Sequence, residues 1–133
     1  MTSVKNVIRY AILFAAVILF AGLLAKQSWS LYKAIFHESG GAWLDLGDIV
    51  GLMLNYIFLI PLMFVLFGER RKYILVIVFL IPILLFEWGS SSLFLMQDLV
   101  LAMLGFVIGL VSRFVATKIL GKMPRFESWK KYF

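Results

Sequence analysis

Apolar residues fill four long stretches of this chain, and polar residues gather in the segments between them. The stretches cover residues 7–25, 48–68, 73–89 and 93–114. A helix that crosses a bilayer needs about 20 mostly apolar residues, and snorkelling side chains at its ends make the shortest stretch long enough. The pattern therefore predicts an all-α fold: a polytopic membrane protein in which residues 1–133 form a single domain of four transmembrane helices.

The first stretch has a second interpretation, as the apolar part of a signal peptide, because Lys5 and Arg9 precede or begin it. Signal-peptide cores contain about 7–15 apolar residues and lead to an A-x-A cleavage pattern. This stretch is longer, and Leu23 and Ala25 match the pattern poorly. A retained helix is therefore favoured.

Two further segments combine basic and aromatic residues. Residues 27–38 place Trp29 and Tyr32 near one face, which predicts a short, separate helix that rests in the outer interface and anchors there through these rings. The tail, residues 118–133, is expected to bind anionic lipids of the inner leaflet, or else to dock onto a cytoplasmic partner. Its predicted lipid anchors are Arg125, Trp129, Lys130 and Lys131.

Composition excludes a soluble domain. The chain is 63% hydrophobic with a mean hydropathy of +1.00, whereas soluble domains contain about 45–50% apolar residues. It contains no cysteine, so disulfides and thiolate metal sites are excluded. The net charge of +6 is expected to face lipid head groups, not nucleic acid, because the charges lie between and beyond the apolar stretches.

Charge also predicts the orientation. Eleven of the 13 Lys and Arg residues lie near the N-terminus, between the second and third stretches, or from Arg113 onward, while Lys26 and Lys33 lie on the opposite side. Cytoplasmic loops carry the excess of Lys and Arg, so both termini are predicted to be cytoplasmic. Such a strong bias argues against a small dual-topology transporter or channel.

Polar residues near the outer ends of three stretches form a candidate binding site. Asp48 and Asn55 are seven residues apart and share a helix face, while Glu87 and Asp98 flank the polar break between the third and fourth stretches. Intramembrane ionisable groups are functional candidates by default. The predicted cluster contains Asp48, Asn55, Glu87, Gln97 and Asp98. Simple solvation of the two acids at the interface is the alternative.

Small residues follow Asp98 along one face of the fourth stretch at intervals of three and four. Such a stripe lets helices approach closely in lipid. The predicted packing seam contains Ala102, Gly105, Gly109, Ser112 and Ala116, and it would turn Asp98 toward protein; a homodimer seam is the alternative. Pro61 and Pro82 are predicted to bend the second and third helices near the middle of the membrane.

Parts of the chain resemble the VanZ-like family of small bacterial membrane proteins. The stretch "NYIFLIPLMF", residues 55–64, is similar to the family's N-x-x-x-F/L-x-P segment, and "DLVLAMLGFVIG", residues 98–109, is similar to its D-x-x-x-N-x-x-G-x-x-x-G segment. The residues that match are Asn55, Pro61, Glu87, Asp98, Gly105 and Gly109. Ala102 stands where the family has Asn, Ser90 where it has Gln and Met63 where Gly is common, and the family's arginine between the two acids is absent.

The resemblance implies a bacterial cytoplasmic-membrane protein with relatives linked to glycopeptide resistance and cell-surface processes. The sequence lacks a Ser–His–Asp set, an HExxH motif and a Gly-rich phosphate loop, so an enzyme is not expected, and neither is a cofactor or metal. The favoured hypothesis is that the cluster forms an outward pocket for a polar or cationic head group. A non-catalytic subunit of a larger membrane complex, or a homodimer, is the alternative.

Overall fold

The computed structural model describes residues 2–36, 47–68, 72–89 and 92–120. Within these ranges the chain forms α1 (Thr2–Phe36), α2 (Gly47–Phe67), α3 (Lys72–Trp88) and α4 (Ser92–Leu120). The all-α prediction with four helices is therefore confirmed for the described residues. The predicted tail, apart from its first three residues, lies outside them.

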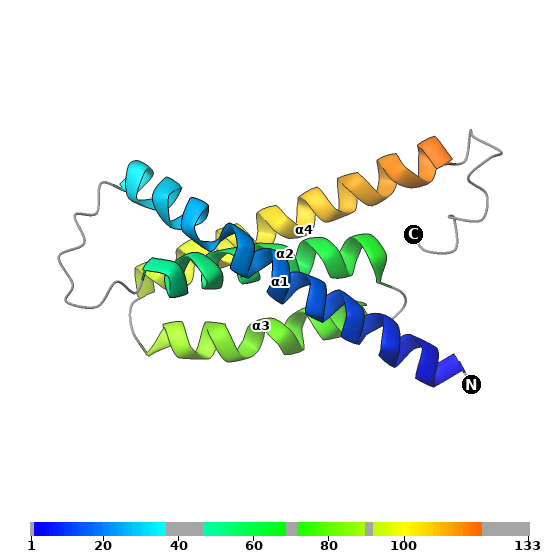
Figure 1. The fold of residues 1–133 in the computed structure, drawn as a ribbon. Coiled ribbons are helices and arrows are strands. Elements are labelled where there is room, and N and C mark those ends of the chain that lie inside the picture. Colours follow the sequence, from blue (N-terminus) through cyan, green and yellow to red (C-terminus); the bar gives the residue numbers. More distant parts are fainter. Residues whose placement is uncertain (1, 37–46, 69–71, 90–91, 121–133) are drawn as a thin grey trace.

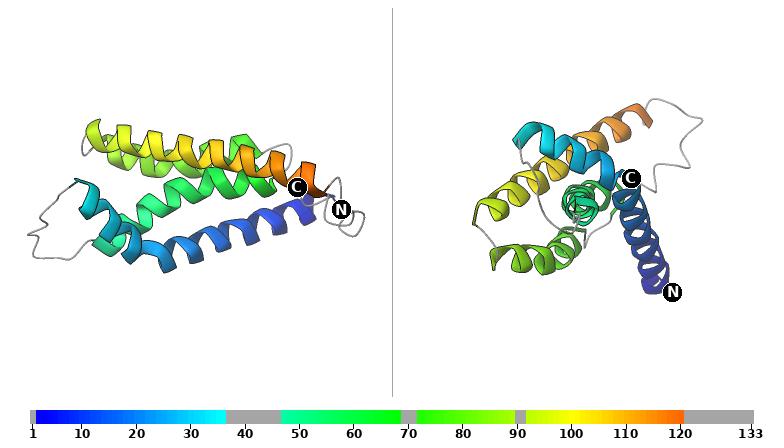
Figure 2. Two further views of the ribbon diagram at one scale, coloured as in Figure 1. Left: turned by 90° about the horizontal axis from the view of Figure 1, so that it is seen from above. Right: turned by 60° about the vertical axis from the view of Figure 1, so that its left-hand side comes forward.

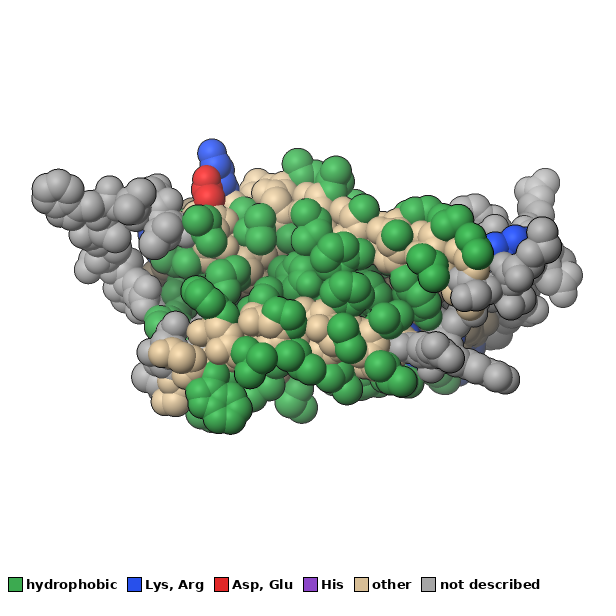
Figure 3. All heavy atoms as spheres, turned by 90° about the horizontal axis from the view of Figure 1, so that it is seen from below, with side chains coloured by type: hydrophobic (Ala, Val, Ile, Leu, Met, Phe, Trp, Pro, Cys, Tyr) green, Lys and Arg blue, Asp and Glu red, His purple; other side chains and the backbone are tan. Residues whose placement is uncertain are grey.

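Three helices contain segments long and apolar enough to cross a membrane: Val4–Ile35, Gly47–Phe67 and Phe94–Ile119. The apolar segment of α3, Lys72–Phe86, is shorter. Hydrophobic side chains cover the face of the molecule in Figure 3 along most of its length, and the charged side chains visible there lie toward its ends. This distribution is what a bilayer as solvent requires.

The first helix corrects one prediction. Residues 27–36 do not form a separate interfacial helix but continue α1 without interruption; residues 37 and 38 lie outside the described ranges. No Gly or Pro stands between Ala25 and Phe36 to end the helix, so an amphipathic change in sequence does not become a break in the backbone. The two views of Figure 2 show that α1 instead changes direction between its blue and cyan parts.

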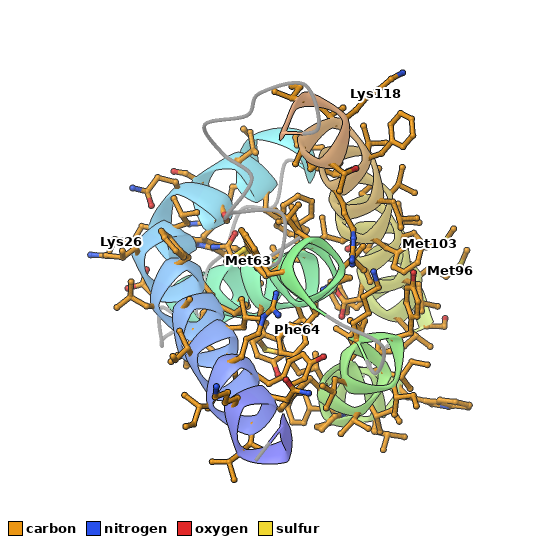
Figure 4. The ribbon with its side chains drawn as sticks, turned by 90° about the vertical axis from the view of Figure 1, so that its right-hand side faces the viewer. Lys26, Met63, Phe64, Met96, Met103 and Lys118 are labelled. Atoms are coloured by element: carbon orange, nitrogen blue, oxygen red, sulfur yellow. The ribbon has the colours of Figure 1, made fainter. Side chains whose placement is uncertain are left out.

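The second helix occupies the centre. The right-hand view of Figure 2 shows α2 nearly end-on, with the other helices around it. The buried core contains Val17, Ala21, Tyr56, Ile57, Ile60, Phe64, Val76, Leu80 and Ala102. Looking along the bundle, Figure 4 shows Phe64 between the helices, whereas Lys26, Met96, Met103 and Lys118 point away from the centre.

Aromatic rings join α3 to this core. Phe14 and Phe79 stack with ring centroids 4.6 Å apart. Tyr56 of α2 donates a hydrogen bond from its hydroxyl to the backbone oxygen of Phe79, at 3.2 Å. Both α2 and α3 continue through their internal prolines, of which Pro61 is fully buried and Pro82 is exposed.

Small residues bring α2 very close to α1 and α4. A Cβ atom on Gly51 would lie 2.0 Å from the backbone oxygen of Ala25, and one on Gly105 would lie 2.2 Å from the backbone oxygen of Phe58. Gly109 continues the contact one helical repeat later, with its virtual Cβ 2.9 Å from the oxygen of Leu62. The backbones of α1 and α2, and those of α2 and α4, are therefore in direct contact where these helices cross.

Basic side chains from the other three helices converge on the C-terminal end of α2. Arg9 of α1 donates to the backbone oxygen of Phe67, and Arg113 of α4 donates to those of Val65 at 3.1 Å and Gly68 at 3.0 Å. Lys72, at the start of α3, approaches the same Val65 oxygen at 3.5 Å. The last carbonyl groups of a helix have no partner within it and carry its negative dipole end, so cations are favourable there.

Candidate functional site

A groove runs between the C-terminal half of α1 and the N-terminal halves of α2 and α4. Its volume is about 540 Å³. Its polar lining residues are Ser28, Tyr32, Asn55 and Gln97, and the remaining lining side chains are Leu, Ile, Val, Met and Phe. The groove lies toward the opposite end of the bundle from the basic residues around the end of α2, since antiparallel connections place the end of α1 beside the start of α2 (Figure 1).

One polar pair ties α1 to α2 within the groove. Ser28 donates from its hydroxyl to Asn55 Oδ1 at 2.6 Å, and Asn55 Nδ2 donates to the backbone oxygen of Ala21 at 3.2 Å. The amide thus finds both a donor and an acceptor on α1, as a polar group in a membrane requires.

A second polar pair joins α1 to α4. The hydroxyl of Tyr32 donates to Gln97 Oε1 at 3.2 Å. The Tyr32 ring stacks on Trp29 with ring centroids 5.7 Å apart and planes 12° from parallel, and Lys33 Nζ lies 5.0 Å from the centre of the Trp29 ring. Tyr32 thus bonds to α4 while its ring stacks on Trp29 within α1.

A smaller cavity of about 110 Å³ adjoins the groove and shares Tyr32, Leu54 and Gln97 with it. Asp98, which is 4% exposed, and Trp29 also line this cavity. The Trp29 Nε1 atom is buried and has no hydrogen-bond partner among the described residues. Gly47 lies directly against the indole, since a Cβ there would be 2.0 Å from Nε1.

The structure places the predicted site residues in three different surroundings. Asn55 and Gln97 line the groove, whereas Asp98 lines the smaller cavity. Asp48 is exposed and lines neither space. The side chain of Glu87 lies outside the described residues. Of the predicted cluster, the groove therefore contains Asn55 and Gln97, and the smaller cavity contains Gln97 and Asp98.

The seam on α4 faces α2 in its first part. Ala102, Gly105 and Gly109 are buried, while Ser112 and Ala116 are partly exposed. Asp98 lies at the start of this buried row and touches the smaller cavity beside α2. The close contacts of Gly105 and Gly109 are thus made within one chain.

Sequence reasoning missed the part of α1 that completes the site. Ser28, Leu31, Tyr32 and Ile35 all line the groove, and their spacing of three, one and three residues is that of one helix face. A separate interfacial helix was expected over this segment, with Trp29 and Tyr32 facing head groups. Treating α1 as one continuous helix would have revealed the face.

The described residues contain no group of three or more His, Cys, Asp or Glu side chains that could hold a metal ion. The lining of the groove offers apolar surface together with hydrogen-bond donors and acceptors. No protein-family model matches this sequence, no curated protein matches it, and no solved structure matches it.

Proposed function

We propose that this chain is a membrane protein whose groove binds an amphipathic lipid molecule, with the hydrocarbon chain along the apolar lining and the head group at the polar pairs. The single observation that carries the proposal is the groove of about 540 Å³ with only four polar lining residues. Ligand pockets of this kind span about 300–1,000 Å³ and combine an apolar lining with a few placed polar groups.

The exposed apolar side chains along the groove favour a lipid as the ligand. Large apolar side chains at the groove stay exposed: Met96 is 65% exposed, Leu31 is 63% exposed and Val100 is 57% exposed. Water would make this exposure costly, whereas a hydrocarbon chain covers it. The proposed site thus opens sideways toward the lipid phase.

The polar groups favour an uncharged, hydroxyl-bearing head group. Tyr32, Asn55 and Gln97 each carry both donor and acceptor capacity, whereas the Trp29 indole N–H is a donor only. The smaller cavity, which adjoins the groove at Tyr32 and Gln97, adds the Trp29 indole and the Asp98 carboxyl group. A hydroxyl that reaches this cavity can accept a hydrogen bond from the indole and donate one to the carboxyl group. An ammonium group donates but cannot accept, so of the polar or cationic head groups predicted from the sequence, the polar one is favoured.

We place the protein in the bacterial cytoplasmic membrane with both termini cytoplasmic and with α3 as the fourth span. The Lys and Arg bias supports the orientation, and the VanZ-like segments support the location. The groove then lies in the outer half of the bundle. An enzyme activity is not proposed, because the sequence lacks the catalytic motifs named above. A role as a non-catalytic subunit is the competing proposal.

Filling the groove tests the proposal. Val100→Trp places a large ring in the groove, whereas Val107→Trp makes the same change seven residues later on the same face of α4, where Val107 is 51% exposed and does not line the groove. The probes are a fluorescent monoacylglycerol and a fluorescent alkylamine of equal chain length. We expect the monoacylglycerol to bind better, and Val100→Trp alone to weaken its binding about tenfold or more, equivalent to about 1.4 kcal/mol.

Equal binding by both Trp variants and the wild-type protein would overturn the groove as the site. Better binding of the alkylamine would overturn the hydroxyl-bearing head group. Saturable binding by a particle whose mass is that of one chain would count against an obligatory subunit role.

A further inference from the structure

The basic side chains at the C-terminal end of α2 supply more positive charge than the negative end of the helix dipole can offset. Lys72, Arg113 and Arg9 are three basic side chains, whereas the end of a helix carries about half an elementary negative charge. The last turn of α2 itself contains no basic residue. All three cations come instead from the helices packed around it, so the excess charge is a property of the assembled bundle (Figure 1).

Counting the described residues alone, the two groups that share one carbonyl make fewer hydrogen bonds than they have N–H donors, with Lys72 buried and Arg113 half-buried. Lys72 Nζ and Arg113 Nη1 both approach the Val65 oxygen, at 3.5 and 3.1 Å. All the hydrogen bonds that Lys72 and Arg113 donate to described residues end on backbone oxygens. An ammonium offers three N–H donors and a guanidinium five, so an oxyanion can be bound without breaking the contacts with α2.

The surroundings restrict which oxyanion fits. The site lies at the end of the bundle, beside the exposed apolar side chains of Tyr73 and Phe114, which are 45% and 64% exposed. Lys72 Nζ also lies 5.0 Å from the centre of the Tyr73 ring. Basic pockets between membrane helices at the level of the head groups bind anionic phospholipids.

We propose that Lys72 and Arg113 form a binding site for the phosphate of an anionic phospholipid. The site is separate from the groove, which lies toward the other end of α2, and its ligand is anionic where the groove's head group is uncharged. Arg9 donates to the neighbouring Phe67 carbonyl and adds to the positive potential. The bound phosphate offsets the repulsion between two cations held at one carbonyl oxygen.

The test compares the apparent affinities of the full chain for fluorescent phosphatidylglycerol and fluorescent phosphatidylcholine in the same neutral detergent. We expect the wild-type protein to prefer phosphatidylglycerol. Lys72→Gln and Arg113→Gln should each weaken that binding about fivefold, and together about 25-fold. The matched control is Lys118→Gln, which removes a charge from an exposed residue of α4. Lys118 Nζ lies 5.3 Å from the centre of the Phe114 ring.

Equal losses in Lys118→Gln and in the double variant would overturn the proposal, because a general effect of net charge would then explain the preference. Displacement of the lipid by millimolar inorganic phosphate would overturn the lipid as the source of the anion. If the Gln variants do not fold, the wild-type protein alone still tests the proposal. Equal affinity of the wild-type protein for phosphatidylglycerol and phosphatidylcholine would contradict it. Val100→Trp should leave this affinity unchanged, so the two proposals fail separately.

Discussion

At the scale of single residues, glycine decides how closely α2 approaches its neighbours. Gly51 and Gly105 each face a backbone oxygen of another helix, at distances that leave no room for a Cβ atom. In lipid, helix association depends on such van der Waals contact, because lipid chains are as apolar as the side chains they replace. A side chain at either position must push two backbones apart.

Gly105→Ala should therefore destabilise the bundle by about 1–3 kcal/mol, since the new methyl group would lie 2.2 Å from the oxygen of Phe58. Gly22→Ala is the matched control: nothing lies within 4 Å of a Cβ at Gly22, so its stability should be unchanged or higher by up to about 1 kcal/mol. Thermal unfolding in detergent, followed by circular dichroism, measures both. Equal melting temperatures would show that the crossing is looser than described.

At the scale of elements, α1 and α2 are held together by polar groups as well as by close packing. Asn55 contacts both the side chain of Ser28 and the backbone of Ala21. Hydrogen bonds between membrane helices contribute about 0.6 kcal/mol on average and up to about 1.7 kcal/mol. The short Ser28–Asn55 contact lies within the groove, so it links the stability of the α1–α2 pair to the site.

A double-mutant cycle with Ser28→Ala and Asn55→Ala tests this link. We expect a coupling free energy of about 0.5–1.5 kcal/mol, with Asn55→Ala the more destabilising single change because Asn55 also loses its contact with Ala21. Unfolding in detergent with increasing denaturant gives the four stabilities. Strict additivity would mean that the two side chains act independently.

At the scale of the whole molecule, the arrangement places basic groups at one end of the bundle and the groove toward the other. Arg9, Lys72 and Arg113 meet at the C-terminal end of α2. Segments rich in Lys and Arg stay on the cytoplasmic side during membrane insertion. The proposed orientation therefore sets the groove in the outer half of the bundle. The proposed location of the lipid head group depends on this orientation.

Single cysteine variants test the orientation directly, because the natural chain contains no cysteine. An impermeant thiol reagent added outside intact cells should label Ser91→Cys and should reach Arg71→Cys only after the membrane is opened. The reverse result would invert the proposed topology. Equal labelling of both from outside would indicate dual topology and revive the transporter hypothesis.

Much of the fold could be predicted from the sequence, because each apolar stretch carries its own signal. The predicted stretch 48–68 and the observed α2, Gly47–Phe67, differ by one residue at each end, and so do the stretch 73–89 and α3. The error in α1 arose where a change in side-chain polarity was taken for a change in backbone. The fourth stretch, 93–114, was predicted as a membrane span that continues as helix past the interface, and α4 does continue to Leu120.

The site was less predictable because its residues come from separate helices. Asn55 and Gln97 stand out in the sequence as polar residues within apolar runs, and both line the groove. Ser28 and Tyr32 lie in a segment of mixed polar and aromatic residues that predicted lipid anchoring, and they became part of the site only when α2 and α4 packed beside the C-terminal half of α1. Asp98 was grouped with Asn55 because both were predicted at similar depth on inward helix faces, yet the two line different cavities.

The sequence by itself determined that the chain forms helices, where they run and that apolar surface faces outward, because hydropathy and helix length are local properties of consecutive residues. Only the tertiary structure decided that α2 is the central helix, that a groove lies between α1 and α4, and that three cations meet at one helix end. Those features depend on crossing points between distant segments. The crossings are fixed where Gly51 and Gly105 let backbones touch, and no single stretch of sequence specifies its partner.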